Sequence, residues 1–157
     1  MIAKIPHPKL ILMTKVGFER LTMEKQELEG GRPEAVLDLK KAREMGDLSE
    51  NGYYKSARFK LSSIDARLRY LAHVLRYAKV QEIIAKDVVD IGVTVQLEGP
   101  EGEVIYTIVG EHEANPSDKK ISHLSPLGRA LLGKKNGEEA TIVIPSGQKS
   151  YKIKKSS

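Results

Sequence analysis

Apolar residues recur three and four positions apart along two long stretches in the first half of the chain. In the later stretch the series is unbroken and runs through Tyr54, Ala57, Leu61, Ile64, Leu68, Leu71, Leu75 and Ala78. The earlier stretch, which follows a candidate N-cap at Thr14, keeps the same frame through Phe18, Leu21, Leu28, Ala35, Leu39 and Ala42, with Lys25 and Arg32 as polar members. This spacing places one apolar seam on each helix. Because a very short segment joins the two stretches, we expect an antiparallel helical hairpin.

One segment of the first stretch conflicts with a continuous helix. Gly30 and Gly31 each cost about 1 kcal/mol relative to alanine in a helix, and Pro33 has no N–H to donate to the carbonyl of Glu29. We therefore expect a kink or a short break at residues 30–33.

The second half of the chain changes to a period of two, which is typical of strands. Residues 93–97 and 104–109 predict one β-hairpin around a turn at 99–102, and residues 140–144 and 150–153 predict another around 145–147. Between them Ser125 is a suitable N-cap, Pro126 suits the first helical position, and Gly133 suits the end of a short helix. The predicted organisation is a helical hairpin over residues 1–82 and a small α+β domain with an antiparallel sheet over residues 83–157.

Composition removes several classes of function. The 157 residues include no Cys, and the four His lie far apart, so neither a thiolate nucleophile nor a His-based metal cluster is expected. No apolar run approaches the roughly 18 residues of a membrane span, and we expect a cytoplasmic protein without a membrane partner. Residues 1–82 carry 16 Lys and Arg against 11 Asp and Glu, whereas residues 83–157 carry 10 of each. This excess indicates either a polyanionic partner for the hairpin or a solvated helix surface with many ion pairs.

Residues 46–51, which join the two helices, include several residue types that are suited to ending one helix and starting the next. Gly46 suits the left-handed position that ends a helix, and Ser49, or else Asp47, is a good N-cap for the next helix. Glu50 would then lie in a first turn, where the helix dipole favours an acid. Local structure alone therefore favours a capping role, while the long hairpin would also place Asp47 and Glu50 far from any core.

Two groups of motifs stand out beyond the helical and strand patterns. The first is Ala42-Arg43 followed by Gly46-Asp47-Leu48-Ser49-Glu50-Asn51. The second combines Ile108-Val109-Gly110, Glu113-Ala114, Ile121-Ser122, the run from Ser125 to Lys134, Pro145, Gly147 and Tyr151. Together they resemble the motifs of a known family, the bacterial transcript cleavage factors GreA and GreB, and the first group is similar to the hairpin-tip signature of that family. The resemblance extends from about Met13 to Ile153, and GreA fits better than GreB. One departure is Asn51-Gly52-Tyr53-Tyr54, where family tips commonly have Asn-Ala-Glu-Tyr.

The resemblance implies an N-terminal antiparallel coiled coil and an FKBP-like C-terminal domain. Family members bind bacterial RNA polymerase and reach through its secondary channel, where the polymerase's own active site cleaves backtracked RNA. Asp47 and Glu50 match the acids that help to hold a second Mg²⁺, shared with the polymerase, about 4 Å from the first, and Ser49 matches a neighbouring polar residue that helps to place water or RNA. The isolated protein, which we expect to be a monomer, would then be neither a nuclease nor a tight Mg²⁺ binder.

The resemblance also assigns contacts away from the two acids. Ser125 and Pro126 match the segment that touches the polymerase, and Lys55 and Arg58 are candidates for contact with the nascent RNA 3′ end. Three alternatives remain: a polymerase-binding regulator or inhibitor that does not stimulate cleavage, a peptidyl-prolyl isomerase, and a free-standing nucleic-acid-binding module. The retained Asp47 and Glu50 speak against the first, and the absence of Trp speaks against a proline pocket.

Overall fold

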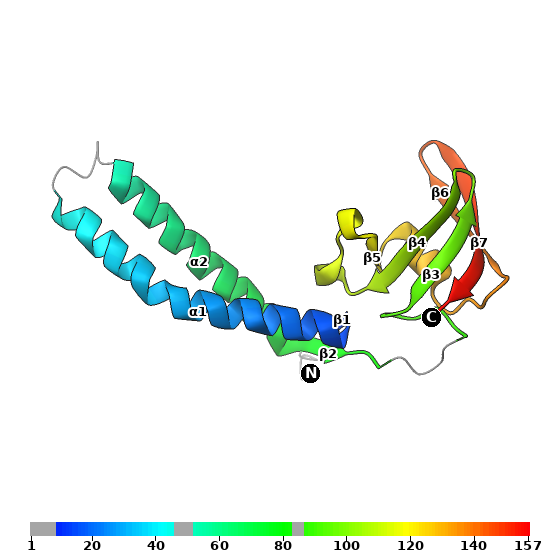
Figure 1. Cartoon of the computed structure of the whole chain (residues 1–157), viewed down its shortest axis with the longest axis horizontal. Coiled ribbons are helices and arrows are strands. Elements are labelled where there is room, and N and C mark those ends of the chain that lie inside the picture. The colour runs from blue at the N-terminus through cyan, green and yellow to red at the C-terminus, as the bar shows by residue number, and fades with distance from the viewer. Residues whose placement is uncertain (1–8, 46–51, 83–86) are drawn as a thin grey trace, which may run out of the picture. The chain divides into compact units, whose positions relative to one another are not determined.

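The structure, a computed structural model, describes residues 9–45, 52–82 and 87–157. The chain divides into two compact units: Glu19–Tyr77 forms one, and Met1–Phe18 together with Ala78–Ser157 forms the other. The first unit is a helical hairpin and the second contains the β-sheets (Figure 1). None of the described helices is long and apolar enough to cross a membrane. The domain boundary expected between residues 82 and 83 stays a prediction. The two compact units meet elsewhere along the chain, after Phe18 and after Tyr77.

Two long helices, α1 (Lys15–Glu44) and α2 (Gly52–Tyr77), make up the hairpin. Among the described residues, ion pairs join them between Glu24 and Arg67, between Arg32 and Asp65, and between Asp38 and Lys60. As the residue number rises in α1 the partner's number falls in α2, so the helices are antiparallel, as predicted. At about 1.5 Å per residue, α2 is about 39 Å long.

The apolar seam lies between the helices, where the spacing placed it. Leu21, Ala35 and Ala42 of α1 are buried, and so are Ala57 and Leu71 of α2. The remaining described members of the two series are half-buried, except Arg32, which is exposed and bonds to Asp65 across the hairpin. Burial of this seam is the main favourable term in the hairpin, because most of the stability of a helix in a protein comes from packing of its apolar face.

The expected break at residues 30–33 is absent. Helix α1 runs without interruption from Lys15 to Glu44 with Pro33 inside it. Gly30, Gly31 and Pro33 are all exposed, so the weak positions face solvent. Leu28 and Ala35, on either side, are held in the seam. Packing therefore outweighs the local cost of the proline and the glycines, which amounts to a few kcal/mol.

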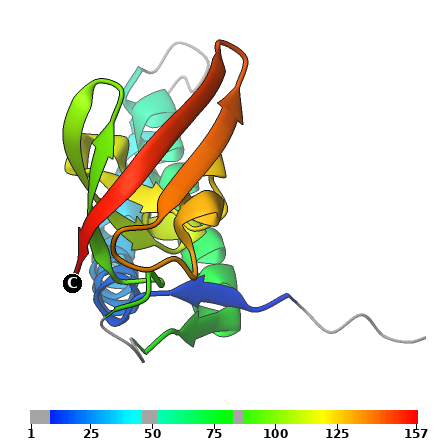
Figure 2. The same cartoon turned by 90° about the vertical axis from the view of Figure 1, so that its right-hand side faces the viewer.

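A pair of short parallel strands flanks the ends of the hairpin sequence. Strand β1 (Ile11–Met13) precedes α1 and strand β2 (Ala78–Val80) follows α2, with Leu12 opposite Lys79. The two lie side by side in Figure 2. Neither strand was predicted, and the helical series was expected to continue through Ala78, which instead begins β2. The β1–β2 pair instead belongs to the compact unit that includes the C-terminal sheet.

The C-terminal sheet has five strands in the order β5-β4-β3-β7-β6. They are β3 (Thr94–Gly99), β4 (Gly102–Val109), β5 (Lys120–Ser122), β6 (Glu139–Ile144) and β7 (Gly147–Ser156). The two predicted hairpins, β3–β4 and β6–β7, are antiparallel and turn at the expected places. Strand β5, which was not predicted, pairs with β4 in parallel. Two 3₁₀ helices, η1 (Glu111–Glu113) and η2 (Pro116–Asp118), lie between β4 and β5.

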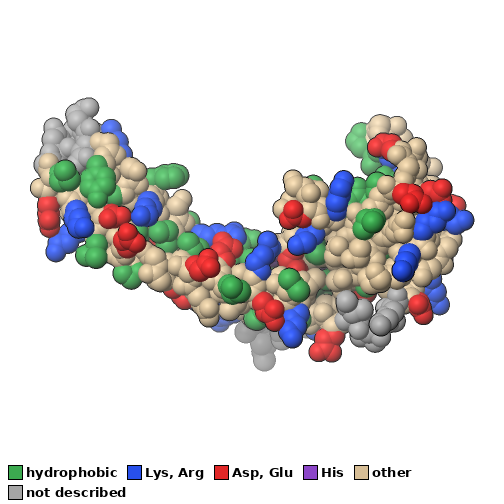
Figure 3. Space-filling model, viewed as in Figure 1, with side chains coloured by type: hydrophobic (Ala, Val, Ile, Leu, Met, Phe, Trp, Pro, Cys, Tyr) green, Lys and Arg blue, Asp and Glu red, His purple; other side chains and the backbone are tan. Residues whose placement is uncertain are grey.

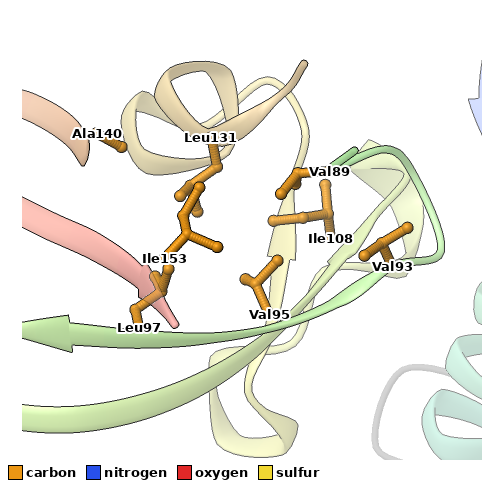
Figure 4. Packing of buried hydrophobic residues seen from close by; sticks show 8 residues of the cluster. All are labelled: Val89, Val93, Val95, Leu97, Ile108, Leu131, Ala140 and Ile153. Atoms are coloured by element: carbon orange, nitrogen blue, oxygen red, sulfur yellow. The ribbon is translucent and has the colours of Figure 1, made fainter. Parts of the chain in front are cut away.

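Helix α3 (Pro126–Leu131) packs beside β6 and β5 and closes the core. Side chains from β3, β4, β6, β7 and α3 converge there, together with two from the segment before β3 (Figure 4): Val89, Val93, Val95, Leu97, Ile108, Leu131, Ala140 and Ile153. The helix is slightly shorter than predicted, and Gly133 just beyond it has φ +77°, a left-handed conformation that glycine adopts without strain. The predicted fold class, a helical hairpin followed by an α+β domain, is confirmed. The narrower FKBP-like assignment stays a prediction.

Candidate functional site

The three candidate residues of the hairpin tip, Asp47, Ser49 and Glu50, lie outside the described residues. What the structure shows is the pair of helix ends that residues 46–51 connect, at Glu44 and Gly52. In the described ranges, 9–45, 52–82 and 87–157, no group of three or more His, Asp or Glu side chains could hold a metal ion.

Basic side chains surround the end of the hairpin that carries this segment. Lys55 and Arg58, the predicted RNA contacts, lie in the first two turns of α2 and are exposed. Further exposed cations occupy the neighbouring turns of both helices: Lys40, Lys41, Arg43 and Lys60. Lys60 bonds to Asp38, with 3.3 Å between Nζ and Oδ2. Figure 3 shows basic, acidic and hydrophobic side chains interspersed over α1 and α2, so the visible face of the hairpin is not a uniform basic surface.

Large apolar side chains are also exposed near the same end. Tyr53, which stands where family tips commonly have Glu, is 43% exposed, and Met45 is 72% exposed. Phe59 on α2 is 75% exposed, one turn beyond Lys55. The sequence placed Tyr54 on the seam, and the structure agrees, since Tyr54 is half-buried. Exposed aromatic faces beside cations are a combination suited to unpaired nucleic-acid bases.

Farther from this end, ion pairs fasten the two helices together. Arg67 Nε lies 2.6 Å from Glu24 Oε1, and its second nitrogen lies 2.9 Å from Oε2. This hydrogen bonding lowers the pKa of the Glu24 carboxyl, and Arg32 lowers the pKa of Asp65 in the same way. The two-pronged Arg geometry fixes the register of one helix against the other. In this part of the hairpin, charged residues on the surface therefore form ion pairs, which was one of the two explanations offered for the excess of basic residues.

These pairs predict that the hairpin loses stability in acid. The two carboxyls have lower pKa values in the folded chain than the roughly 4 expected when unfolded, so their contribution is complete above that value and is lost as pH falls through the folded pKa. The helical circular dichroism signal should melt at lower temperature at pH 3 than at pH 6. The Glu24→Gln variant should show a smaller difference between the two pH values, and Glu27→Gln on the same helix should behave as the wild type. Equal pH dependence in all three proteins would contradict the role of this pair.

The other candidate contact lies at the start of α3. Ser125 is half-buried, its hydroxyl donates to Ser122 O at 2.7 Å and accepts from Gly128 N at 3.0 Å, and it is the N-cap that the sequence predicted. Pro126 is exposed at the first helical position, and Leu124 beside it is 37% exposed. Pro126 and Leu124, on either side of the hydrogen-bonded Ser125 cap, thus form a small exposed apolar surface that is suited to a protein partner.

One residue with a specific environment was not singled out by the sequence as a site. Glu113 in η1 is buried, and it accepts hydrogen bonds from Thr14 and Gly110. Thr14 precedes it by 99 residues, so no local pattern could connect the two. Two signals were available, the N-capping character of Thr14 and the place of Glu113 in the second group of family motifs, but neither connects the acid to Thr14.

Comparison with known proteins gives matches over nearly the whole chain. The family model described as "Transcription elongation factor, N-terminal" matches residues 11–80, and the one described as "Transcription elongation factor, GreA/GreB, C-term" matches residues 84–157. The chain is 39% identical over 145 residues to a transcription elongation factor GreA from Nitratiruptor sp., covering 90% of this chain and 89% of that protein. It is 42% identical over 150 residues to GreA from Caldanaerobacter subterraneus subsp. tengcongensis, covering 92% and 96%.

Among solved structures, the crystal structure of GreA factor homolog 1 from Thermus thermophilus is 27% identical, with 95% of this chain and 99% of that chain covered and a TM-score of 0.46. The family models and the curated relatives establish the family without it. They also agree with the expectation that the protein is an elongation factor and not itself an enzyme. The chain belongs to the GreA/GreB family of transcription elongation factors.

Proposed function

We propose that this protein binds bacterial RNA polymerase through the secondary channel and stimulates the polymerase's own cleavage of backtracked nascent RNA. The observation that carries the proposal is the antiparallel hairpin whose far helix ends, Glu44 and Gly52, are joined by the segment that contains Asp47 and Glu50. A two-helix arm of this length buries little beyond its own seam, so its length is best explained by reach. Membership in a family of elongation factors supplies the context.

The donor chemistry of the tip suits the metal that the family resemblance implies. Asp47 and Glu50 offer carboxylate oxygens, the ligands that Mg²⁺ prefers, and one or two carboxylates are a typical protein contribution to a site completed by other groups. When bound, Mg²⁺ supplies charge stabilisation at a phosphate and a more acidic water. In the proposal Asp47 and Glu50 share this ion with the polymerase's own carboxylates, and Ser49 hydrogen-bonds to water or RNA beside them.

Other described residues take supporting roles in this proposal. Lys55 and Arg58, which are exposed within two turns of the start of α2, hold the phosphates of the RNA 3′ end. Tyr53, which is exposed and precedes Lys55 by two residues, stacks on a base of the same RNA. Pro126 at the rigid start of α3 contacts the polymerase, with Ser125 holding the cap. The direct test is RNA cleavage by a stalled, backtracked polymerase with and without the protein.

The RNA contacts predict a specific dependence on salt. Each phosphate contact by a cation adds about 0.7 to the slope of log affinity against log salt for a single strand. The Lys55→Gln/Arg58→Gln double variant should therefore need several-fold more protein for half-maximal cleavage at low salt, and it should lose less activity than the wild type as salt rises. The control is Arg69→Gln, an exposed cation about 17 Å farther along the helix. An unchanged salt slope in the double variant would remove these two residues from the RNA contact.

The alternative is a polymerase-binding regulator that does not stimulate cleavage. The same experiment separates the two functions, because a regulator of that kind would bind the backtracked complex without raising the cleavage rate. The pair of acids at positions 47 and 50 favours the cleavage factor, since a regulator has no need for carboxylates that suit a metal.

A further inference from the structure

Glu113 has an environment that is unusual for an acid in this protein. Among the described residues it is the one charged side chain in the buried class, at 5% exposure. It ends η1, next to the short strand β1 that leads into α1. A carboxylate is not removed from water at this level unless hydrogen bonds replace its hydration.

Donors from two distant parts of the chain satisfy this carboxylate. Its Oε2 accepts from the backbone N–H of Thr14 at 2.9 Å and from that of Gly110 at 3.0 Å, and its Oε1 accepts from the Thr14 hydroxyl. The Thr14 hydroxyl oxygen in turn accepts from Gly17 N at 2.9 Å, which caps the start of α1. A continuous chain of hydrogen bonds therefore runs from the first turn of α1 to the segment after β4.

Two glycines make room for this arrangement. A Cβ added at Gly17 would lie 1.9 Å from Glu113 Oε1, and one added at Gly110 would lie 2.3 Å from Leu12 O. Neither distance is possible without movement of the neighbouring atoms. By contrast, a Cβ at Gly30 or Gly31 would meet nothing within 4 Å. The glycines beside Glu113 are thus needed for close packing, whereas those in the middle of α1 are not.

We propose that Glu113 is a positioning residue that fastens the first turn of α1 to the C-terminal unit, so that stimulation of cleavage depends on it although it lies far along the chain from Asp47 and Glu50. The start of α1 belongs to the same compact unit as Glu113, while the rest of this unbroken helix belongs to the hairpin. Because α1 is continuous from Lys15 to Glu44, a change at its fastened first turn can be passed along the helix toward the segment that holds Asp47 and Glu50. The link to cleavage rests on the proposed function, whereas the fastening itself does not.

The fastening can be tested by hydrogen exchange on the full-length chain. In Glu113→Gln and in Thr14→Val, the amides of Gly17 and Phe18 should exchange at least about tenfold faster, while the amides of β3 and β7 stay protected. Because both variants break one hydrogen-bond chain, the double variant should exchange no faster than the faster single variant. The matched control is Glu111→Gln, an exposed acid in the same 3₁₀ helix, which should match the wild type. Wild-type exchange in Glu113→Gln, or effects that simply multiply in the double variant, would overturn the proposal.

The consequence for activity is tested separately with the backtracked polymerase. Glu113→Gln should displace a labelled wild-type protein from the polymerase as well as unlabelled wild type does, yet at saturation it should give a several-fold lower cleavage rate. A merely destabilised protein would lose binding and rate together, which would contradict a positioning role. If the wild type itself fails to stimulate cleavage, the proposed function is wrong, while the exchange result still decides whether Glu113 fastens α1.

Discussion

Replacing either acid of the hairpin tip should abolish stimulated cleavage while leaving polymerase binding intact. Asp47→Asn and Glu50→Gln keep the size of each side chain but remove the negative charge that a hard cation requires. Charge stabilisation by a metal at a reacting phosphate is worth several kcal/mol, and each 1.4 kcal/mol is about tenfold in rate, so we expect a loss of at least about 100-fold. The measurement is the rate of RNA shortening in a backtracked complex at saturating protein.

A nearby acid provides the matched control for this result. Glu44 is exposed and ends α1, only a few residues before Asp47, so Glu44→Gln changes the charge of the same region without touching the candidate pair. This variant should retain cleavage within about twofold, as expected for an exposed residue away from the chemistry. Full activity of Asp47→Asn or Glu50→Gln would contradict the proposed role of the acids. An equal loss in Glu44→Gln would show that cleavage depends on the negative charge of the region and not on these two acids in particular.

The hairpin shows which parts of the fold a sequence pattern can predict. Residue spacing alone predicted the seam from Phe18 to Ala42 and from Tyr54 to Leu75. Apolar residues spaced three and four apart lie on one face of a helix, and that face is the one that becomes buried. The break expected at Pro33 was wrong, since tertiary packing on both sides outweighed a local preference. Arg32, a polar interruption of the seam, is explained only by Asp65 on the other helix.

The elements that the sequence missed are those defined by distant partners. Strands β1, β2 and β5 have three residues each, too few for an alternating pattern to be recognised. Their identity as strands depends on pairing with another segment, β1 with β2, where Ile11 is opposite Ala78, and β5 with β4, where Lys120 is opposite Thr107. Glu113 was missed as a site for the same reason, because its role depends on Thr14. Of the candidate site, Lys55, Arg58 and Pro126 are exposed, while Asp47, Ser49 and Glu50 lie outside the described residues, so the roles of all these residues stay predictions.

Truncating Leu131, the fully buried leucine of α3, should destabilise the C-terminal domain severely. Leu131 is fully buried among residues of the sheet, and Leu→Ala at such a site costs about 2–5 kcal/mol through lost transfer free energy and the cavity that remains. The six-residue helix has little stability of its own and is held by this contact. We expect Leu131→Ala to lower the midpoint of urea unfolding, followed by the near-ultraviolet signal of Tyr106 and Tyr151, which pack against the core.

The control for Leu131 is Val143→Ala, which removes apolar atoms from a strand of the same sheet at a position that is 73% exposed. Its effect should stay within about 0.5 kcal/mol, and a comparable loss in both variants would refute the role of the α3 packing. The functional consequence distinguishes this variant from those at the tip. Because α3 begins with Ser125 and Pro126, loosening it should weaken polymerase binding, and cleavage should fall in proportion and recover at high protein concentration. Asp47→Asn should show the opposite behaviour, with normal binding and no recovery, so the two experiments together separate docking by the C-terminal domain from chemistry at the hairpin tip.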